Sequence, residues 1–88
     1  MHTIELVSYM KIEVTYFAML REQRGVTVEQ LESSAVTLGE LYGEIADRHG
    51  FTLDSTLIRA ARNNVFVAMS TALEDGDSVV YMPPVAGG

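Results

Sequence analysis

The chain has 88 residues, of which 48% are hydrophobic, so it is long enough for one small domain and too apolar for a disordered segment. It has no cysteine, which excludes disulfides and thiolate metal sites. It also has no apolar run near the roughly 18 residues that span a bilayer, so the sequence predicts a cytoplasmic protein without a membrane partner. Twelve acidic residues against six basic ones give a formal charge of −6, which argues against nucleic acid as a partner because phosphate binding needs a basic surface.

The sequence patterns divide the chain into a leader at residues 1–9, a domain at residues 10–82 and a tail at residues 83–88. From Lys11 the sequence KIEVTYFAM alternates with the two-residue period of a strand. Its two faces are Ile12, Val14 and Tyr16 on one side and Glu13, Thr15 and Phe17 on the other. One helical turn that ends at Gly25 should follow. The alternating residues 26–31 then predict a second strand, antiparallel to the first because the connection is short.

The main helix is predicted to begin after Thr37, because Thr37 and Glu40 have the spacing of a capping box. Apolar residues then recur at helical spacing and form one stripe: Leu38, Leu41, Tyr42, Ile45 and Ala46. Gly50 supplies the stop, since glycine readily adopts the left-handed conformation that ends helices. Within the helix, Gly43 is expected to permit the close approach of a neighbouring segment.

Further strands are predicted after the helix. Residues 57–62 and 65–69 form two short apolar runs on either side of Asn63-Asn64, a pair that suits the turn of a hairpin. A helix over residues 56–62 is the alternative interpretation, because Ala60 and Ala61 favour it. Residues 73–77 form a turn with Asp-Gly at its centre, and Ser78–Met82 is the last strand.

The resulting order is ββαβββ, which predicts an α+β domain with one main helix packed on one face of a mixed sheet. The crossover through that helix returns the chain parallel to the first strand, in the centre of the sheet. The last strand runs into an extended tail, Pro83-Pro84-Val85-Ala86-Gly87-Gly88. The prolines stiffen the base of this tail, and the glycines make its end thin enough to pass through a narrow slot. A frayed terminus is the alternative interpretation.

Side chains suited to catalysis or metal binding are few. The histidines are His2 and His49, and the carboxylates of Asp75 and Asp77 have the pattern of a turn rather than of a calcium loop. No serine or threonine stands in a nucleophile motif, and there is no glycine-rich phosphate loop. These patterns predict no metal site and no bound cofactor. They leave the carboxylate of Gly88 as the reactive group of a carrier or substrate, rather than of an enzyme on its own.

Four segments carry a resemblance to a known family. They are residues 16–22 (YFAMLRE), the turn at Asn63, residues 73–79 (LEDGDSV) and residues 82–88 (MPPVAGG). Over residues 10–88 the chain resembles the small subunit of molybdopterin synthase, a sulfur carrier with the ubiquitin-like β-grasp fold. Arg62 departs from the family pattern, in which a small apolar residue is expected before Asn63.

The resemblance implies a carrier cycle. A ubiquitin-activating-type enzyme uses ATP to adenylate the carboxylate of Gly88, and a sulfur donor protein converts the adenylate to a thiocarboxylate. The tail, which Gly87 allows to thread, then enters the large subunit of the heterotetrameric synthase, where sulfur passes to the cyclic pterin precursor of the molybdenum cofactor. A thiamine-type sulfur carrier, a ubiquitin-like protein modifier and an interaction module with an inert tail are the alternatives.

The β-grasp resemblance also implies a docking surface. If Val79 and Tyr81 point inward, Val80 and Met82 face outward beside Phe17 of the adjacent parallel strand. An exposed apolar patch at the base of the tail is the kind of surface that a partner protein covers.

Overall fold

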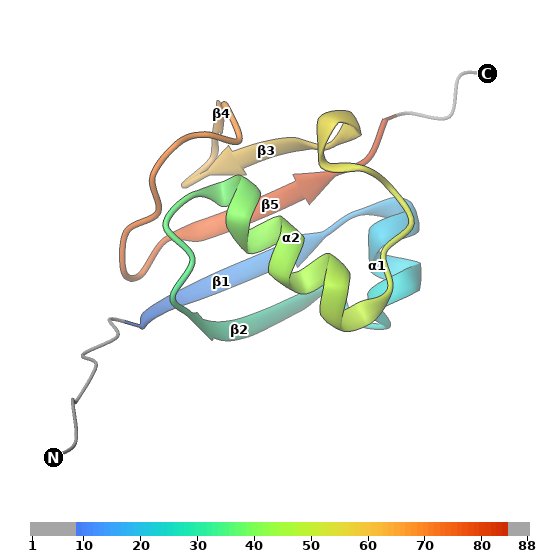
Figure 1. Ribbon diagram of the computed structural model, residues 1–88, viewed down its shortest axis with the longest axis horizontal. Helices are drawn as coiled ribbons and strands as arrows, with labels where there is room; N and C mark the ends of the chain where they lie inside the picture. The colour runs from blue at the N-terminus through green and yellow to red at the C-terminus, as the bar shows by residue number, and fades with distance from the viewer. Residues whose placement is uncertain (1–8, 85–88) are drawn as a thin grey trace, which may run out of the picture.

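The computed structural model describes residues 9–84, so residues 1–8 of the predicted leader and residues 85–88 of the tail lie outside the described residues. Within residues 9–84, five strands form one sheet in the order β2-β1-β5-β3-β4, and helix α2 lies across one face of it (Figure 1). The strands are β1 (Met10–Tyr16), β2 (Val28–Ser33), β3 (Arg59–Arg62), β4 (Val65–Val67) and β5 (Ser78–Met82). The helical segments are α1 (Ala18–Arg24), α2 (Leu38–His49) and a 3-10 turn, η1 (Ser55–Leu57).

The sheet is mixed, as predicted. β1 pairs antiparallel with β2 on one side and parallel with β5 on the other, and β3 pairs antiparallel with both β5 and β4. From β2 the chain crosses one face through α2 and re-enters the sheet as β3, then turns back as β4 at the edge. β5 enters last, between β1 and β3 and parallel to β1. The α+β class, the main helix and the central last strand are therefore confirmed. The predicted return from the main helix directly to a strand parallel to the first is wrong, because the strand after α2 is β3, which pairs antiparallel with β5 and does not pair with β1.

The predicted end of the first strand is wrong. β1 ends at Tyr16, and Phe17 is the N-cap residue of α1. α1 has seven residues, whereas the sequence predicts a single helical turn that ends at Gly25. Ala18 adopts a φ of 51°, in the left-handed region, so the backbone turns away from the sheet there. The alternation of side chains continues past this point in the sequence, and for this reason periodicity did not mark the boundary. The second strand also lies later than predicted, at Val28–Ser33.

Helix α2 begins and packs as its sequence predicts. The Thr37 hydroxyl accepts a hydrogen bond from the Glu40 N–H at 3.1 Å, and the Glu40 carboxylate accepts one from the Val36 N–H at 2.7 Å. Gly50 ends the helix with a φ of 71°. The apolar stripe is buried against the inner face of the sheet, and the core so formed includes Ile12, Val14, Tyr16, Leu38, Leu41, Tyr42, Ile45, Val79 and Tyr81.

The glycine that permits a close approach is Gly39, not Gly43 as predicted. The Gly39 N–H donates to the carbonyl of Met69 at 2.8 Å, and a Cβ at this position would stand 3.2 Å from that same oxygen. A Cβ built at Gly43 meets no atom within 4 Å. The loop that crosses the start of α2 therefore depends on the first glycine, and it comes from a segment remote in sequence.

The hairpin interpretation of residues 57–69 is confirmed and the helical alternative is wrong. Asn63 and Asn64 adopt φ values of 50° and 71°, the left-handed conformation that asparagine tolerates better than most residues. The two strands are shorter than predicted, because residues 55–57 form η1 and pairing with β3 ends at Val67.

Candidate functional site

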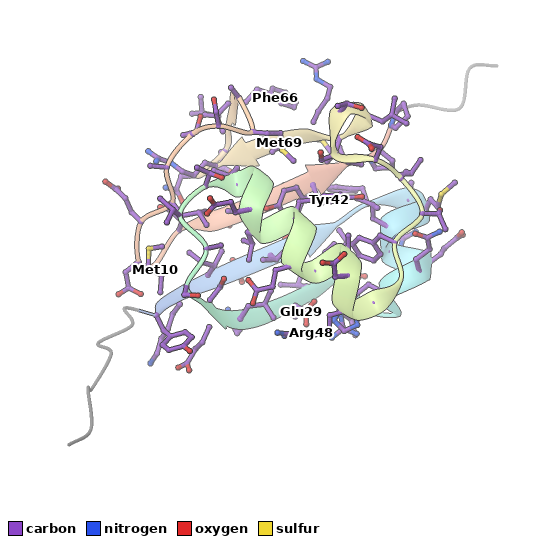
Figure 2. All side chains as sticks on the ribbon, in the orientation of Figure 1. Met10, Glu29, Tyr42, Arg48, Phe66 and Met69 are labelled. Carbon is purple, nitrogen blue, oxygen red and sulfur yellow. The ribbon has the colours of Figure 1, made fainter. Side chains whose placement is uncertain are left out.

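Strand β5 carries the chain from the centre of the sheet to the base of the tail. Val79 and Tyr81 point toward α2 and are fully buried. The Tyr81 hydroxyl donates a hydrogen bond to the carbonyl of Leu38 at 2.6 Å. The Tyr81 ring packs edge-on against the ring of Tyr42, a residue of α2 that is labelled in Figure 2. Pro83 therefore follows a strand that is held on both edges by β1 and β3 and on one face by the helix.

An apolar hollow, here called the tail-base hollow, lies where β5 ends. It has a volume of about 710 Å³ and is formed by α1, by the loop after α2 and by the end of β5. Its lining residues are Phe17, Ala18, Met19, Glu22, Leu53, Met82, Pro83 and Pro84. Phe17 and Met19 expose 47% and 44% of their surfaces, so large apolar side chains face solvent here. A contiguous apolar surface of this kind commonly marks a site of protein contact.

Two of the three predicted docking residues, Phe17 and Met82, lie together in the tail-base hollow. They meet because Tyr16 and Tyr81 are paired in the parallel register of β1 and β5, so the residue after each lies at the same level. Phe17 reaches the hollow from the first residue before α1 rather than from the outer face of β1, which corrects the predicted placement.

Val80, the third predicted docking residue, faces the same side of the sheet as Met82 but lies outside the hollow. It is half-buried and pairs with Thr15 of β1 and with Ala61 of β3. Ala61 in turn pairs with Phe66 of β4, which therefore lies on this face too and is 61% exposed. Phe66 was not predicted as a site residue. The sequence nevertheless contains the information that places Phe66 on this face, because the Asn63-Asn64 turn and the alternation of the two strands determine that Phe66 pairs with Ala61.

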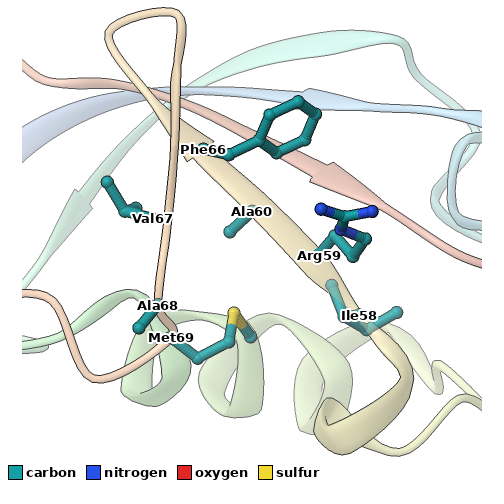
Figure 3. Close-up of a pocket in the computed structure, with 7 residues that line it drawn as sticks. All are labelled: Ile58, Arg59, Ala60, Phe66, Val67, Ala68 and Met69. Atoms are coloured by element: carbon teal, nitrogen blue, oxygen red, sulfur yellow. The ribbon is translucent and has the colours of Figure 1, made fainter.

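A second, smaller hollow of about 330 Å³ opens beside β3 and β4 (Figure 3). It is lined by Ile58, Arg59, Ala60, Phe66, Val67, Ala68 and Met69. The guanidinium carbon of Arg59 lies 5.0 Å from the centre of the Phe66 ring, within range of a cation–π interaction. Arg59 is also paired with Met82 in the sheet, so this positive charge stands next to the tail-base hollow.

The wall of the tail-base hollow that contains Leu53 is held by hydrogen bonds. The Tyr42 hydroxyl donates to the carbonyl of Leu53 at 2.7 Å. The adjacent Thr52 is joined to α1 by a reciprocal pair of hydrogen bonds. The side-chain amide nitrogen of Gln23 donates to the Thr52 hydroxyl at 2.8 Å, and the Thr52 N–H donates to the side-chain oxygen Oε1 of Gln23 at 3.2 Å. Because these contacts involve only the chain itself, the hollow is formed before any partner arrives.

Helix α1 is anchored to β2 by an ion pair. Arg24 donates from Nε to Oε2 of Glu29 and from Nη2 to Oε1, both at 2.7 Å. The Tyr16 hydroxyl donates to Oε2 of the same carboxylate at 2.6 Å. The hydrogen bonds from Arg24 hold the pKa of Glu29 below its ordinary value. Burial, together with the bond to Glu29, raises the pKa of Tyr16. The helix that carries Met19 and Glu22 is thus fixed at its far end.

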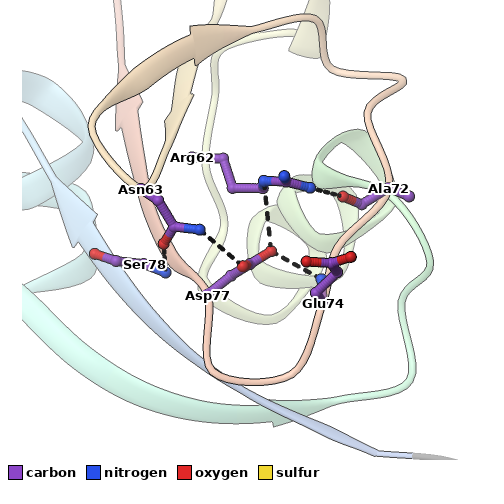
Figure 4. Close-up of polar contacts among 6 residues, drawn as sticks. All are labelled: Arg62, Asn63, Ala72, Glu74, Asp77 and Ser78. Atoms are coloured by element: carbon purple, nitrogen blue, oxygen red, sulfur yellow. Dashed lines mark hydrogen bonds and ion pairs between the residues drawn. The ribbon is translucent and has the colours of Figure 1, made fainter.

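The turn before β5 is organised by a buried carboxylate (Figure 4). Asp77 is 4% exposed and accepts hydrogen bonds from the Asn63 amide at 3.0 Å and from the Glu74 N–H at 2.8 Å. The carbonyl oxygen of the Asn63 side chain accepts from the Ser78 N–H at 2.9 Å. Arg62, the residue that departs from the expected family pattern, places its Nε 3.8 Å from Asp77. Asp77 therefore serves the turn, as predicted.

Residues 9–84 contain no cluster of histidine, aspartate or glutamate side chains placed to hold a metal ion. No helix among these residues is long and apolar enough to cross a membrane. The predicted reactive and threading residues, Gly88, Gly87, Ala86 and Val85, lie outside the described residues. Their roles remain predictions, and the described part of the site is the base of the tail with the surface around it.

The sequence matches a known protein family and several of its members. The family model described as the ThiS family matches residues 14–88. The chain is 34% identical over 80 residues to the molybdopterin synthase sulfur carrier subunit of Escherichia coli (strain K12), an alignment that covers 88% of this chain and 99% of that protein.

Two solved structures extend the comparison. The first is the complex of subunits 1 and 2 of the molybdopterin-converting factor from Helicobacter pylori 26695. One of its chains is 29% identical, with a TM-score of 0.60 and coverage of 90% of this chain and 100% of that chain. The ubiquitin of Caldiarchaeum subterraneum, at 18% identity, has a TM-score of 0.60 over 92% of this chain and 100% of that chain, and shows the ubiquitin-like β-grasp fold alone. The chain therefore belongs to the ThiS family and, within it, to the molybdopterin synthase sulfur carrier subunits, the family that its four matching segments predict.

Proposed function

We propose that this chain carries sulfur on the carboxylate of Gly88 and delivers it to the large subunit of molybdopterin synthase. Besides family membership, the observation that carries this proposal is the course of β5, which is held in the centre of the sheet and ends at Pro83 beside a preformed apolar hollow. A partner that covers the hollow receives a tail whose starting point and direction are fixed. The four residues after Pro84 then reach roughly 13 Å when extended.

The carrier chemistry starts from a poor electrophile. The carboxylate of Gly88 resists attack by a sulfur nucleophile until it is activated. An adenylating partner of the ubiquitin-activating type supplies this activation by transferring AMP from ATP, with release of pyrophosphate. Sulfide-level sulfur supplied by a donor protein then attacks the acyl carbon, so that a C–S bond replaces the C–O bond to AMP, AMP leaves and a thiocarboxylate is formed. In the large subunit this sulfur passes to the cyclic pterin precursor, and hydrolysis of the acyl group by water restores the carboxylate and completes the cycle.

The tail and the surface have separate roles in this proposal. Pro83 and Pro84 restrict the directions in which the tail can leave the sheet, because each has a fixed φ. Gly87 and Ala86 are small enough to pass through a narrow channel in the partner, and Val85 joins them to the prolines. Phe17 at the start of α1, together with Val80 and Met82 of β5, meets the large subunit. The chain thus supplies the sulfur-bearing end, and its partners supply the catalytic side chains.

Intact-mass spectrometry tests the proposal directly. The chain is produced together with the activating enzyme and sulfur donor of the same organism. The expected product is heavier by the exchange of one oxygen for one sulfur, and fragmentation confines this change to Gly88. Deletion of Gly88 should abolish it, and addition of the large subunit with the pterin precursor should reverse it.

Other outcomes of the same experiment distinguish the alternatives. Adducts joined through Gly88 to lysines of other proteins would support a protein modifier. A thiocarboxylate that is consumed only by a thiazole-forming partner would support the thiamine-type carrier. An unaltered C-terminus in the presence of active partners would contradict every carrier function and support an interaction module.

A further inference from the structure

A short row of residues lies at the level where the tail begins, from the start of α1 to the outer face of β5 and β3. Tyr16 and Tyr81 are paired between β1 and β5, so Phe17 and Met82 lie beside each other at the next level. Met82 is paired on its other side with Arg59 of β3. The order along this row is therefore α1 with Phe17, then Met82, then Arg59, and the middle of the row is apolar.

A negative charge stands at the α1 end of this row. Glu22 is the one charged side chain among the eight described residues that line the tail-base hollow, and it is exposed. Within residues 9–84 it takes part in no ion pair, since the pairs found there join other residues. When a partner covers the apolar hollow, water is removed from this carboxylate. An unpaired carboxylate in that position costs free energy unless the partner supplies a cation.

A positive charge stands at the β3 end. Arg59 is exposed and, within the described residues, also takes part in no ion pair. Its guanidinium is held 5.0 Å above the Phe66 ring, so its position is restrained before any partner binds. Because Arg59 adjoins Met82, a partner that packs on Met82 also comes close to this charge.

We propose that Glu22 and Arg59 together set the orientation in which the large subunit docks, with a cationic side chain of the partner facing Glu22 and an anionic one facing Arg59. This inference rests on the proposed function, because that function names the partner. An apolar contact at Phe17 and Met82 alone permits several rotations about the direction of the tail. Opposite charges on the two sides of that contact favour one rotation, because the reversed one brings like charges together.

The orientation matters because the tail is short. Four residues follow Pro84, so the sulfur-bearing end reaches its destination only if the entrance in the partner is aligned with the end of β5. A partner rotated about the apolar contact would still bury Phe17 but would not align its entrance. The charges of Glu22 and Arg59 therefore select the productive orientation of the complex rather than adding much affinity of their own.

Charge reversal with matched controls tests this inference. The affinity of the full-length chain for the large subunit of the same organism is measured by surface plasmon resonance at low and moderate salt. Glu22→Arg and Arg59→Glu are compared with Asp47→Arg and Arg48→Glu, which make the same charge changes on exposed residues of α2. Each reversal at the docking face should weaken binding by about tenfold or more at low salt, and each control by about twofold or less, because only the former oppose charges across the interface.

The possible outcomes separate this inference from the function on which it rests. Equal effects of the docking-face and α2 reversals would show that only overall charge matters, and would overturn the inference. So would self-association of the wild-type chain that Glu22→Arg disrupts, because the occupant would then be a second copy. If a reversal unfolds the chain, Glu22→Gln and Arg59→Gln should still weaken binding in the same direction. Failure of the wild-type chain to bind the large subunit at all would instead contradict the proposed function.

Discussion

The side-chain amide of Asn63 donates to the carboxylate of Asp77 at 3.0 Å, which joins the turn between β3 and β4 to the turn that precedes β5. The backbone reinforces this contact, because the Asn63 N–H donates to the carbonyl of Ser78 at 2.7 Å. The start of the tail-bearing strand is thus fixed at one end of the sheet, while Tyr81 fixes its other end against α2.

Removal of the Asp77 carboxylate should destabilise the fold. Asp77→Ala leaves the Asn63 amide and the Glu74 N–H without their acceptor, and we expect a loss of about 2–3 kcal/mol in the free energy of unfolding, measured in urea. Arg62→Ala is the comparison, because its Nε lies 3.8 Å from the carboxylate and the side chain is partly exposed, and it should cost about 1 kcal/mol or less. A larger loss for Arg62→Ala would contradict the assignment.

The two glycines of α2 should respond in opposite ways to alanine. Gly43→Ala should stabilise the chain by about 1 kcal/mol, because the added Cβ meets nothing within 4 Å and alanine favours the helix. Gly39→Ala should bring no such gain and should lower the melting temperature, because its Cβ would stand 3.2 Å from the Met69 carbonyl oxygen. Thermal unfolding of the two variants checks this, and a gain of equal size in both would disprove the close approach.

Alkaline conditions should unfold the protein through its buried tyrosines. Burial raises the pKa of Tyr81, and burial with the bond to Glu29 raises the pKa of Tyr16, so folding favours their neutral form. A raised pKa in the folded state gives stability that is fully present below the ordinary tyrosine value of 10.0 and is lost as the pH rises above it. Tyrosinate absorbance should appear together with loss of circular dichroism, and Tyr81→Phe should make the loss of stability with pH less steep.

Acid conditions should act through Glu29. Its pKa is lowered by the hydrogen bonds from Arg24, so the stability it contributes is fully present above the ordinary value of 4.5 and is lost as the pH falls through the lowered pKa. Glu29→Gln should therefore be less stable than wild type at neutral pH, and the difference should shrink on acidification. Urea unfolding across this pH range measures it; a constant difference would mean that the carboxylate charge is not responsible.

Phe17→Asp should leave the fold intact and abolish binding to the large subunit. The side chain is 47% exposed, so its loss removes little core contact, whereas a carboxylate in the tail-base hollow opposes burial by a partner. A pull-down with the large subunit measures binding, and circular dichroism verifies folding. Val36→Asp is the control, since Val36 is 61% exposed and lies outside the hollow. Unchanged binding of Phe17→Asp would rule out this surface as the docking site.

Local features of the structure could be predicted because their causes are local. Thr37 and Glu40 form the capping box through bonds that span four residues, and Asn63-Asn64 takes up the turn that its side chains permit. The family, too, followed from short segments, above all from the residues that lead from Met82 to Gly88. The roles of Gly87 and Gly88 still rest on that resemblance.

By itself, the sequence determined the order of elements, the start of the main helix and the diglycine tail, because each depends on residues that are neighbours along the chain. Only the tertiary structure decided that Phe17 leaves the sheet, that Gly39 rather than Gly43 touches a neighbour, and that Arg59 stands beside Met82. The physical reason is that these contacts depend on strand order and register. Both arise when segments far apart in the chain are packed into one sheet and one core.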